Sequence, residues 1–409
     1  MSRVYTSPRV LPLLILGFAS GLPLALVSGT LQAWATVENV SLTEIGFLTL
    51  VGSAYTLKFL WAPLVDRYAP PFLGRRRGWI LVTQLLLAGS IAAMGLFSPA
   101  TNLTGLALLA VWVAFLSATQ DIAFDAYSTD VLRAPERAAG AAIKVMGYRL
   151  AMIASGGLAL ILADRWLGWS NTYFLMGLFM ALCALVTLVA PEPELNSRPP
   201  RSLSEAVVAP LAEFFSRPGA WGILLLIVLY KLGDAFAGAL STTFLIRAAG
   251  FTLSEVGTIN KVFGLAATVI GALMGGAIMA RLGLYRALML FGLLQAVSNL
   301  GYWLIAIQQT PSMVLMGVVV ALENLCGGLG TAAFVALIMA LCNRGYSATQ
   351  FALLSALSAV GRTYLAGPLT PVLVQSLGWP GFFICTVLIA LPGLLMLRSY
   401  RRLINQLDA

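Results

Sequence analysis

Apolar residues occur along this chain in twelve long runs, which shorter polar segments separate. The runs cover about residues 10–35, 45–65, 79–98, 104–129, 140–163, 171–190, 220–247, 254–280, 286–307, 312–342, 349–374 and 380–398. An α-helix needs about 20 mostly apolar residues to cross a bilayer, and each run approaches or exceeds that length. The pattern therefore predicts an all-α membrane protein with 12 transmembrane helices.

Composition and charge support this class and give it an orientation. Of the 409 residues, 59% are hydrophobic and 10% are charged, which is unlike an ordinary soluble domain. With the N-terminus inside, the cytoplasmic segments hold 17 Lys and Arg residues, whereas the outer segments hold two, Arg165 and Arg247. This asymmetry predicts that both termini are cytoplasmic. The net charge of +9 then reflects topology, and we expect no nucleic-acid binding, because the basic residues are spread over seven segments.

Charged residues also occur inside the apolar runs. A charge at the centre of a bilayer costs about 3 kcal/mol or more, so such residues usually face the interior of a helix bundle. Six bases oppose four acids, and this excess of positive charge suits an anionic ligand in a low-dielectric cleft. The ten residues are Lys58, Asp121, Asp125, Lys144, Arg149, Lys231, Asp234, Lys261, Glu323 and Arg362.

The chain repeats itself once. Residues Ser41–Gly46 open the second run, and the similar residues Thr252–Gly257 open the eighth, 211 residues later. Both have a capping-box pattern, with Ser or Thr three residues before Glu. In the fourth–fifth hairpin Asp130 precedes Arg149 by 19 residues, and in the tenth–eleventh hairpin the same spacing separates Asn343 from Arg362. These matches predict two similar six-helix halves.

A polar, proline-rich stretch lies between the halves. We predict an N-terminal half over residues 1–190, a cytoplasmic linker over 191–219 and a C-terminal half over 220–409. Within the linker, residues Ser202–Glu205 would cap a short amphipathic helix with Leu203, Val207, Leu211, Phe214 and Phe215 on its apolar face. An unstructured linker is the alternative.

This plan resembles the major facilitator superfamily, in which two halves bind substrate near the membrane midplane. The segment 62–77 is similar to the signature loop of that superfamily, with Asp66 and Arg67 followed by Arg75 to Arg77. Ala62 stands where the superfamily has glycine. The resemblance implies that Asp66, Arg67 and Arg75 form a cytoplasmic gate. Positive-inside anchoring is the alternative role for Arg75 to Arg77.

Several stretches together resemble the AmpG-type muropeptide permeases. They are Leu16–Pro23, Lys58–Leu64, Gly74–Trp79, Ser117–Asp121, Leu229–Asp234, Glu323–Gly328 and Ser347–Phe351. The resemblance implies a proton-driven importer of the bacterial inner membrane that carries GlcNAc–1,6-anhydro-MurNAc, with or without a stem peptide, from periplasm to cytoplasm. It also implies a place in peptidoglycan recycling and, in some species, β-lactamase induction.

Asp121 and Asp125 are the candidates for proton coupling. They are four residues apart, so they share a helix face, and two carboxylates this close repel each other in a low dielectric. The chain has no histidine, so proton chemistry here must use Asp or Glu. The alternative is structural ion pairing, because Asp121 and Arg149 have similar predicted depths, as do Asp125 and Lys144. If coupling is correct, Asp121→Asn or Asp125→Asn uncouples uptake from the proton gradient.

Seven further polar residues inside the runs are the candidates for substrate binding. An internal ion pair without a ligand is the alternative for each charged one. The candidates are Lys58, Arg149, Lys231, Asp234, Lys261, Glu323 and Asn324.

Other functional classes have less support. An enzyme is disfavoured because the chain lacks histidine, paired metal ligands and a nucleophile motif, and a primary pump because it lacks a Walker A segment. The internal repeat favours alternating access over a channel. We expect a monomer in the lipid bilayer, with an anionic glycopeptide as substrate, protons as the coupling ion, and neither a cofactor nor a metal. A carrier of another anionic solute, such as an acyl-CoA ester, a sugar or a peptide, is the alternative.

Overall fold

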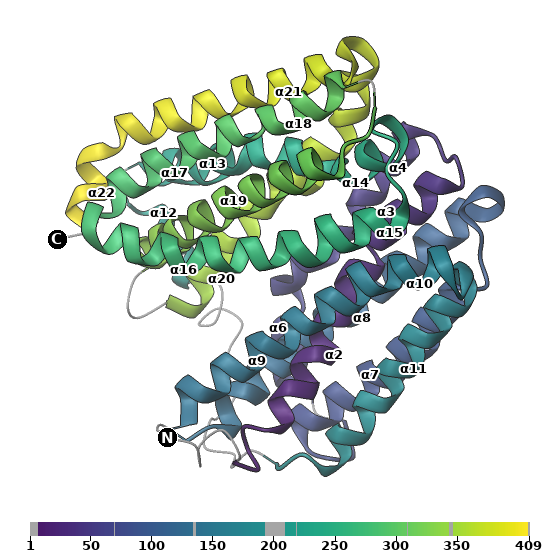
Figure 1. The fold of residues 1–409 in the computed structure, drawn as a ribbon. Helices are drawn as coiled ribbons and strands as arrows, with labels where there is room; N and C mark the ends of the chain where they lie inside the picture. The colour runs from purple at the N-terminus through teal and green to yellow at the C-terminus, as the bar shows by residue number, and fades with distance from the viewer. Residues whose placement is uncertain are drawn as a thin grey trace. The chain divides into compact units, whose positions relative to one another are not determined.

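The computed structural model describes residues 7–68, 70–133, 136–192, 209–217, 219–308, 310–342 and 347–407, which form helices and turns without a strand. Contacts divide the chain into two compact units (Figure 1). Unit 1 comprises Met1–Val40 with Val51–Arg201, and unit 2 comprises Ser41–Leu50 with Ser202–Ala409. The all-α fold class predicted from the apolar runs is confirmed.

The helices up to residue 189 include one stretch that is repeatedly interrupted. They are α2 (Pro12–Leu26), α3 (Gly29–Val37), α4 (Leu42–Leu48), η1 (Thr49–Gly52), α5 (Ser53–Leu57), η2 (Lys58–Leu60), α6 (Ala62–Arg67), α7 (Arg75–Met94), α8 (Pro99–Val131), α9 (Arg137–Met152), η4 (Ile153–Leu158), α10 (Ala159–Arg165) and α11 (Gly168–Val189). Buried side chains of α2, α7 and α8, such as Leu16, Ile80 and Phe124, form an apolar core in unit 1.

The later helices begin with a short one from the predicted linker. They are α12 (Ala209–Phe215), α13 (Ala220–Ala239), α14 (Ser241–Thr243), η6 (Phe244–Ala248), α15 (Leu253–Glu255), η7 (Val256–Phe263), α16 (Gly264–Leu282), α17 (Leu284–Ser298), α18 (Leu300–Ile307), α19 (Met313–Leu341), α20 (Ser347–Val360), η8 (Gly361–Ala366), α21 (Gly367–Ser399) and α22 (Arg401–Leu407). The predicted cap at Ser202–Glu205 lies outside the described residues. Phe214 of α12 joins the apolar core of unit 2, with Ile227, Phe291 and Leu397.

Ten helical stretches within the described residues are long and apolar enough to cross a membrane. The last, Leu353–Ser399, has 47 residues, about twice the length that one crossing needs. It contains two of the predicted spans. A kink at Gly378, which takes a φ of 65°, separates them. The second predicted span is absent from the ten, since it is broken into short pieces.

The broken span runs from Leu42 to Arg67 as α-helical and 3₁₀ pieces rather than as the continuous helix that its apolar run predicts. Trp61 leaves the helix with a φ of −112°, and Pro63 lies in the first turn of α6. Proline lacks an N–H and its ring clashes with the carbonyl four residues earlier, so a continuous helix cannot pass this position without a kink. The break places Lys58 in a 3₁₀ turn.

Both predicted capping boxes are present. The Ser41 hydroxyl accepts a hydrogen bond from the Glu44 N–H at 3.2 Å, and the Ser41 N–H donates to the Glu44 carboxylate. Thr252 and Glu255 make the same reciprocal pair, at 3.3 and 2.8 Å. The internal repeat is therefore visible in local structure as well as in sequence.

Glycines bring different helix pairs together in the two units. In unit 1, a Cβ atom at Gly147 of α9 would overlap the Leu14 carbonyl of α2. In unit 2, a Cβ atom at Gly328 of α19 would overlap the Thr268 carbonyl of α16. Small residues allow this close approach, which membrane helices use in place of a hydrophobic driving force.

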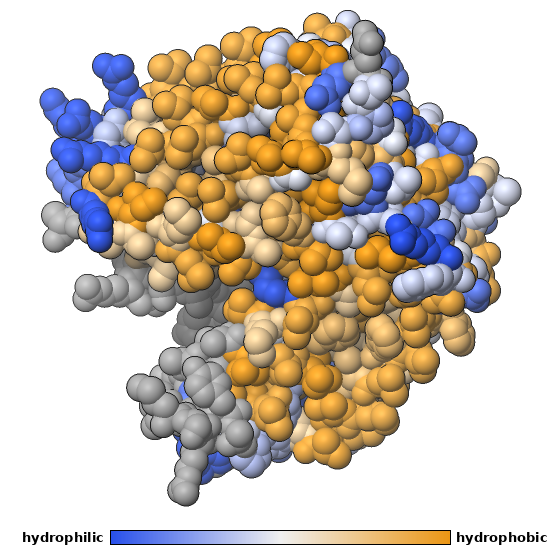
Figure 2. Space-filling view, in the orientation of Figure 1, coloured by the Kyte–Doolittle hydropathy of each residue, from blue (hydrophilic) through white to orange (hydrophobic). Residues whose placement is uncertain are grey.

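The outer faces of the spans are apolar. Ile384, Leu388, Leu391 and Leu395 are exposed along α21 at spacings of three or four residues, so they form one stripe. Figure 2 shows apolar side chains along the exposed faces of α18 and α21, with hydrophilic ones near the helix ends. Soluble monomers rarely expose apolar patches this large, so these faces suit contact with lipid.

Candidate functional site

Asp125 of α8 has a counter-ion on α9. Lys144 Nζ lies 2.6 Å from Asp125 Oδ1 and donates to the Ser128 hydroxyl at 3.0 Å. The same ammonium group lies 4.8 Å from the centre of the Phe124 ring. The ion pair between Asp125 and Lys144, which their predicted depths indicated, is therefore confirmed.

Asp121 has a neutral partner instead of the arginine that its depth suggested. The Ser20 hydroxyl of α2 donates to Asp121 Oδ1 at 2.5 Å, and within the described residues no ion pair joins Asp121 to Arg149. Arg149 follows Lys144 by five residues, so the two side chains point about 140° apart around α9. Because Lys144 faces α8, Arg149 faces elsewhere. The charges that act most strongly on Asp121 are those of Lys58, Asp125 and Lys144.

Further buried polar groups lie close to Asp121 in the fold or in the sequence of unit 1. The Tyr55 hydroxyl pairs with Ser117 and lies within electrostatic reach of Asp121. Both amide atoms of Gln120 are buried, and within the described chain they have no hydrogen-bond partner. Ser117 precedes Asp121 by four residues on α8, and Tyr55 comes from α5 of the broken span. Ser117 and Gln120 belong to the stretch Ser117–Asp121 that carries part of the family resemblance, and a hydroxyl and an amide in an apolar run are visible signals in their own right.

Glu323 is at the centre of the charged cluster in unit 2. Its Oε2 accepts from the Asn324 amide at 2.9 Å, and the Asn324 carbonyl accepts from the Thr268 hydroxyl of α16 at 3.0 Å. No ion pair involves Glu323 among the described residues. The charges that act on it come from four residues on three other elements: Lys231 and Asp234 of α13, Lys261 of η7 and Arg362 of η8.

The lysines of this cluster have mostly neutral partners. Lys231 Nζ lies 3.6 Å from Asp234 Oδ2 and 3.5 Å from the Thr331 hydroxyl. Lys261 Nζ donates to the Thr242 hydroxyl at 3.0 Å. The structure thus brings the predicted residues Lys231, Asp234, Lys261, Glu323 and Asn324 together in unit 2.

Wide helical turns carry two of the bases. Lys261 lies in the π-helical turn η7 and Arg362 in η8. In unit 1 the π-helical turn η4 begins four residues after Arg149. Turns of this type are rare and often occur at functional sites, because they change the direction in which side chains point.

The predicted gate residues lie where α6 ends and α7 begins in unit 1. Asp66 and Arg67 end α6, and their side chains lie outside the described part of the structure. Arg75 begins α7, and the next two residues, Arg76 and Arg77, bind other helices of unit 1. Arg76 Nε pairs with Asp130 Oδ2 at 3.2 Å, and Arg77 donates to the Thr187 and Leu188 carbonyls at the end of α11. Arg77 also lies 3.5 Å from Glu192, and burial raises the pKa of that carboxyl.

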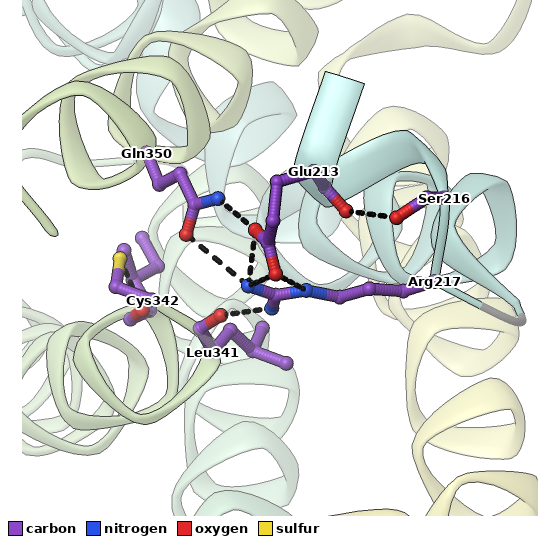
Figure 3. Close-up of polar contacts among 7 residues, drawn as sticks. Glu213, Ser216, Arg217, Leu341, Cys342 and Gln350 are labelled. Atoms are coloured by element: carbon purple, nitrogen blue, oxygen red, sulfur yellow. Dashed lines mark hydrogen bonds and ion pairs between the residues drawn. The ribbon is translucent and has the colours of Figure 1, made fainter. Parts of the chain in front are cut away.

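In unit 2, Arg217 of the predicted linker likewise binds a carboxylate and a backbone carbonyl at the end of a helix (Figure 3). The Arg217 guanidinium binds the Glu213 carboxylate at 2.7 Å, the Leu341 carbonyl at the end of α19 at 2.6 Å and the Gln350 side chain of α20 at 3.3 Å. Gln350 Nε2 donates to Glu213 in turn. This network attaches α12 to α19 and α20. Glu213 and Arg217 have the four-residue spacing of a helical ion pair, which is the one part of this network visible in the sequence.

Comparison with known proteins identifies the family. A model described as the Major Facilitator Superfamily matches residues 13–365. The chain is 60% identical over 400 residues to the anhydromuropeptide permease of Escherichia coli (strain K12), an alignment that covers 98% of this chain and 81% of that protein. It is 34% identical over 418 residues to the putative transporter AmpG 4 of Rickettsia felis, with 99% of both chains covered.

Solved structures with the same fold have little sequence identity. A bacterial homologue of the human lysosomal transporter Spinster has a TM-score of 0.74 and 15% identity, and the match covers 100% of this chain and 98% of that one. A D-xylose–proton symporter has a TM-score of 0.72 and 13% identity, with 96% and 97% covered. These likenesses show the fold, and the predicted superfamily fold is thereby confirmed.

Proposed function

Because the chain belongs to the Major Facilitator Superfamily, we propose that this multi-pass membrane transporter imports anhydromuropeptides by proton-coupled alternating access. The substrate is GlcNAc–1,6-anhydro-MurNAc with or without its stem peptide, carried from periplasm to cytoplasm for peptidoglycan recycling. The observation that carries the proposal is the 60% identity, over 98% of this chain, to the E. coli anhydromuropeptide permease.

The charges embedded in each unit support an anionic substrate. In unit 1, Lys58, Lys144 and Arg149 oppose Asp121 and Asp125, which leaves one positive charge in excess. In unit 2, the bases Lys231, Lys261 and Arg362 oppose Asp234 and Glu323, with the same result. Stem peptides carry carboxylates, which a surplus of base attracts in a low-dielectric site. We assign substrate contact to Lys58, Arg149, Lys231, Asp234, Lys261, Glu323 and Asn324.

Proton coupling is assigned to Asp121 and Asp125, with Asp121 as the favoured member of the pair. Asp125 already has a close counter-ion in Lys144, whereas the described hydrogen-bond partner of Asp121 is the Ser20 hydroxyl. A carboxylate held by a hydroxyl keeps that contact after protonation, so it is suited to gain and lose a proton during the cycle.

The topology and the gate complete the proposal. The excess of basic residues in alternate loops supports cytoplasmic termini and insertion in the bacterial inner membrane. Asp66, Arg67 and Arg75 are proposed to hold the cytoplasmic side closed in the outward-open state, and the protein is proposed to work as a monomer.

Uptake into proteoliposomes tests the function. A labelled anhydro-disaccharide, with and without its peptide, is offered under an inward proton gradient, and a protonophore is added to a parallel sample. The proposal predicts accumulation that the protonophore abolishes and that Asp121→Asn prevents. Uptake of an acyl-CoA ester, a simple sugar or a peptide, without uptake of either muropeptide, would instead support the alternative substrate classes.

A further inference from the structure

Three polar side chains line one face of the ninth span in unit 2. Gln295, Asn299 and Tyr302 follow one another at spacings of four and three residues along α17 and α18. Their exposed fractions are 5%, 1% and 2%, so they lie inside the unit rather than toward lipid or solvent. Burying two amides and a phenol on one face of an apolar interior costs free energy unless these groups have hydrogen-bond partners.

The two amides have unused hydrogen-bonding atoms. Nε2 of Gln295 and both side-chain amide atoms of Asn299 are buried, and they have no partner in the described part of the chain. Buried polar atoms almost always have a partner, which is ordered water when the protein supplies none. These atoms together offer donors and an acceptor, as a bound water requires.

The facing surface of α19 leads from these amides to Glu323. A Cβ atom at Gly330 would overlap Oε1 of Gln295, so that amide lies directly against α19. Glu323, Gly327 and Gly330 are four and three residues apart and share this face. The Tyr302 hydroxyl lies beside the Glu323 carboxylate at the other end. The distance along α19 from Gly330 to Glu323 is about 10 Å.

We infer that the ninth and tenth spans enclose an internal water site, held by Gln295, Asn299 and Tyr302, which hydrates Glu323 and makes this carboxylate a proton carrier of the transport cycle. The inference rests on the proposed proton coupling. Beyond Gln295 the buried Leu288 and Phe291 belong to the apolar core, so the polar end of the site is at Glu323. The Glu323 side chain is itself partly exposed, and its exposed side receives the proton.

The step is a simple proton transfer. A water or hydronium on the exposed side of Glu323 gives one proton to a carboxylate oxygen, and the neutral acid later returns it to water. Water at the enclosed side solvates the ionised form, which the low dielectric of the unit otherwise disfavours. The charged and titratable groups that face Glu323 are Lys231 and Asp234 of α13, Lys261 of η7, Arg362 of η8 and Tyr302 of α18.

Asn299→Leu tests the inference, because it keeps the side-chain size and removes both unpartnered amide atoms. In proteoliposomes we expect its proton-driven uptake of the anhydro-disaccharide to fall at least about tenfold. Counterflow, with substrate on both sides and no proton gradient, should stay within about twofold of the wild type, since it needs no net proton transfer. Gln295→Met should behave in the same way.

The matched control is Gln84→Met in unit 1, which also removes a buried amide with an unpartnered Nε2. It should leave both rates unchanged. Retained counterflow shows that each variant is folded, and if Asn299→Leu does not fold, Gln295→Met carries the test. Proton-driven uptake equal to wild type in Gln295→Met and Asn299→Leu would overturn the inference. Wild-type protein that shows no proton-driven uptake would instead defeat the proposed function.

Hydration has its own readout in the wild-type protein. Hydroxyl radicals generated from ordered water oxidise adjacent side chains, so Tyr302 should be labelled in the wild type and at least about threefold less in Asn299→Leu, whose site lacks the water. Equal labelling in both, or none in the wild type, would show that no water occupies this site.

Discussion

The two units hold their membrane-embedded acids in different surroundings. In unit 1, Asp125 has an ion pair with Lys144 at 2.6 Å, and Asp121 accepts from Ser20. In unit 2, Glu323 contacts the Asn324 amide, and the bases act on it from other elements. Each unit has three embedded bases and two acids, so the formal charge is the same. Each unit also holds one lysine–aspartate pair, and the difference lies in short-range partners: the pair is closer in unit 1, at 2.6 Å against 3.6 Å, and the acid without an ion pair contacts a hydroxyl in unit 1 and an amide in unit 2.

Packing differs between the units as well. Unit 1 brings α2 and α9 together at Gly147, whereas unit 2 brings α16 and α19 together at Gly328. These pairs are not equivalent in the sequence repeat. The second span of the chain is broken, so its pieces cannot form the long, close contact that α16, its counterpart, forms with α19. Two units that share a sequence repeat can therefore have their closest helix–helix contact between different pairs of helices.

The largest effect is expected from neutralising the acids that lack an ion pair. Asp121→Asn and Glu323→Gln should each lower proton-driven accumulation by about a hundredfold or more, because the proton carrier is lost. Exchange of labelled for unlabelled substrate should persist in Asp121→Asn. Glu255→Gln, which alters a helix cap in the same unit as Glu323, serves as the control and should accumulate substrate like the wild type. Normal accumulation by Glu323→Gln would show that Glu323 carries no proton in the transport cycle.

Glycine substitutions should show where each unit is packed most closely. Gly328→Ala and Gly147→Ala should each destabilise the protein by about 2 kcal/mol, because the added methyl group meets backbone atoms that cannot move aside easily. Gly276→Ala is the matched control on α16, since nothing lies within 4 Å of its Cβ position. It should be neutral or stabilising by up to about 1 kcal/mol. Thermal unfolding in detergent measures both, and equal melting temperatures for Gly328→Ala and Gly276→Ala would contradict the packing described.

The polar networks around Arg217 and Arg76 predict a smaller difference. Arg217→Gln should cost about 2 kcal/mol of unfolding free energy, since it removes charge-assisted hydrogen bonds to Glu213 and to the Leu341 carbonyl. Arg217→Lys keeps the charge but cannot make the bidentate contact, so it should recover part of the loss. Arg76→Gln in unit 1 breaks one ion pair with Asp130 and should cost about 1 kcal/mol. A larger loss at Arg76 than at Arg217 would reverse this ranking.

The smallest effect is expected at the ion pair between Lys144 and Asp125. Lys144→Met should destabilise unit 1 by about 1 kcal/mol, a modest value because the Asp125 side chain is 57% exposed. Adding Asp125→Asn should restore most of the loss, since it removes the unpaired charge. A double variant no more stable than Lys144→Met would show that the two residues are not energetically coupled.

Much of the fold follows from local patterns. Apolar runs predict spans because a bilayer demands about 20 apolar residues, and a Ser or Thr three residues before Glu predicts a cap because both hydrogen bonds are local. Both capping boxes and the pair between Asp125 and Lys144 are present for this reason. Helical rise alone places two residues at one depth, however, and says nothing of the direction around the helix. This is why Arg149 was matched with Asp121 although it points elsewhere.

Other features depend on contacts that spacing does not reveal. Gln350 meets Glu213 across 137 residues of sequence, and the π-helical turns at Lys261 and Arg362 have no sequence pattern of their own. Pro63 is a visible signal for the break after Lys58, but the continuous apolar run over residues 45–65 predicts an unbroken helix there. Gln295 and Asn299 were visible polar residues in an apolar run, and the structure shows that they lie buried without partners.

The most direct test of the account is the pH outside de-energised proteoliposomes when an anhydromuropeptide is added. If each substrate molecule enters with a proton, the weakly buffered medium becomes more alkaline, and the change saturates with substrate concentration. Asp121→Asn and Glu323→Gln should each abolish the change, and labelled substrate should still exchange in Asp121→Asn. Entry of labelled substrate into wild-type vesicles without any change of external pH would contradict proton coupling.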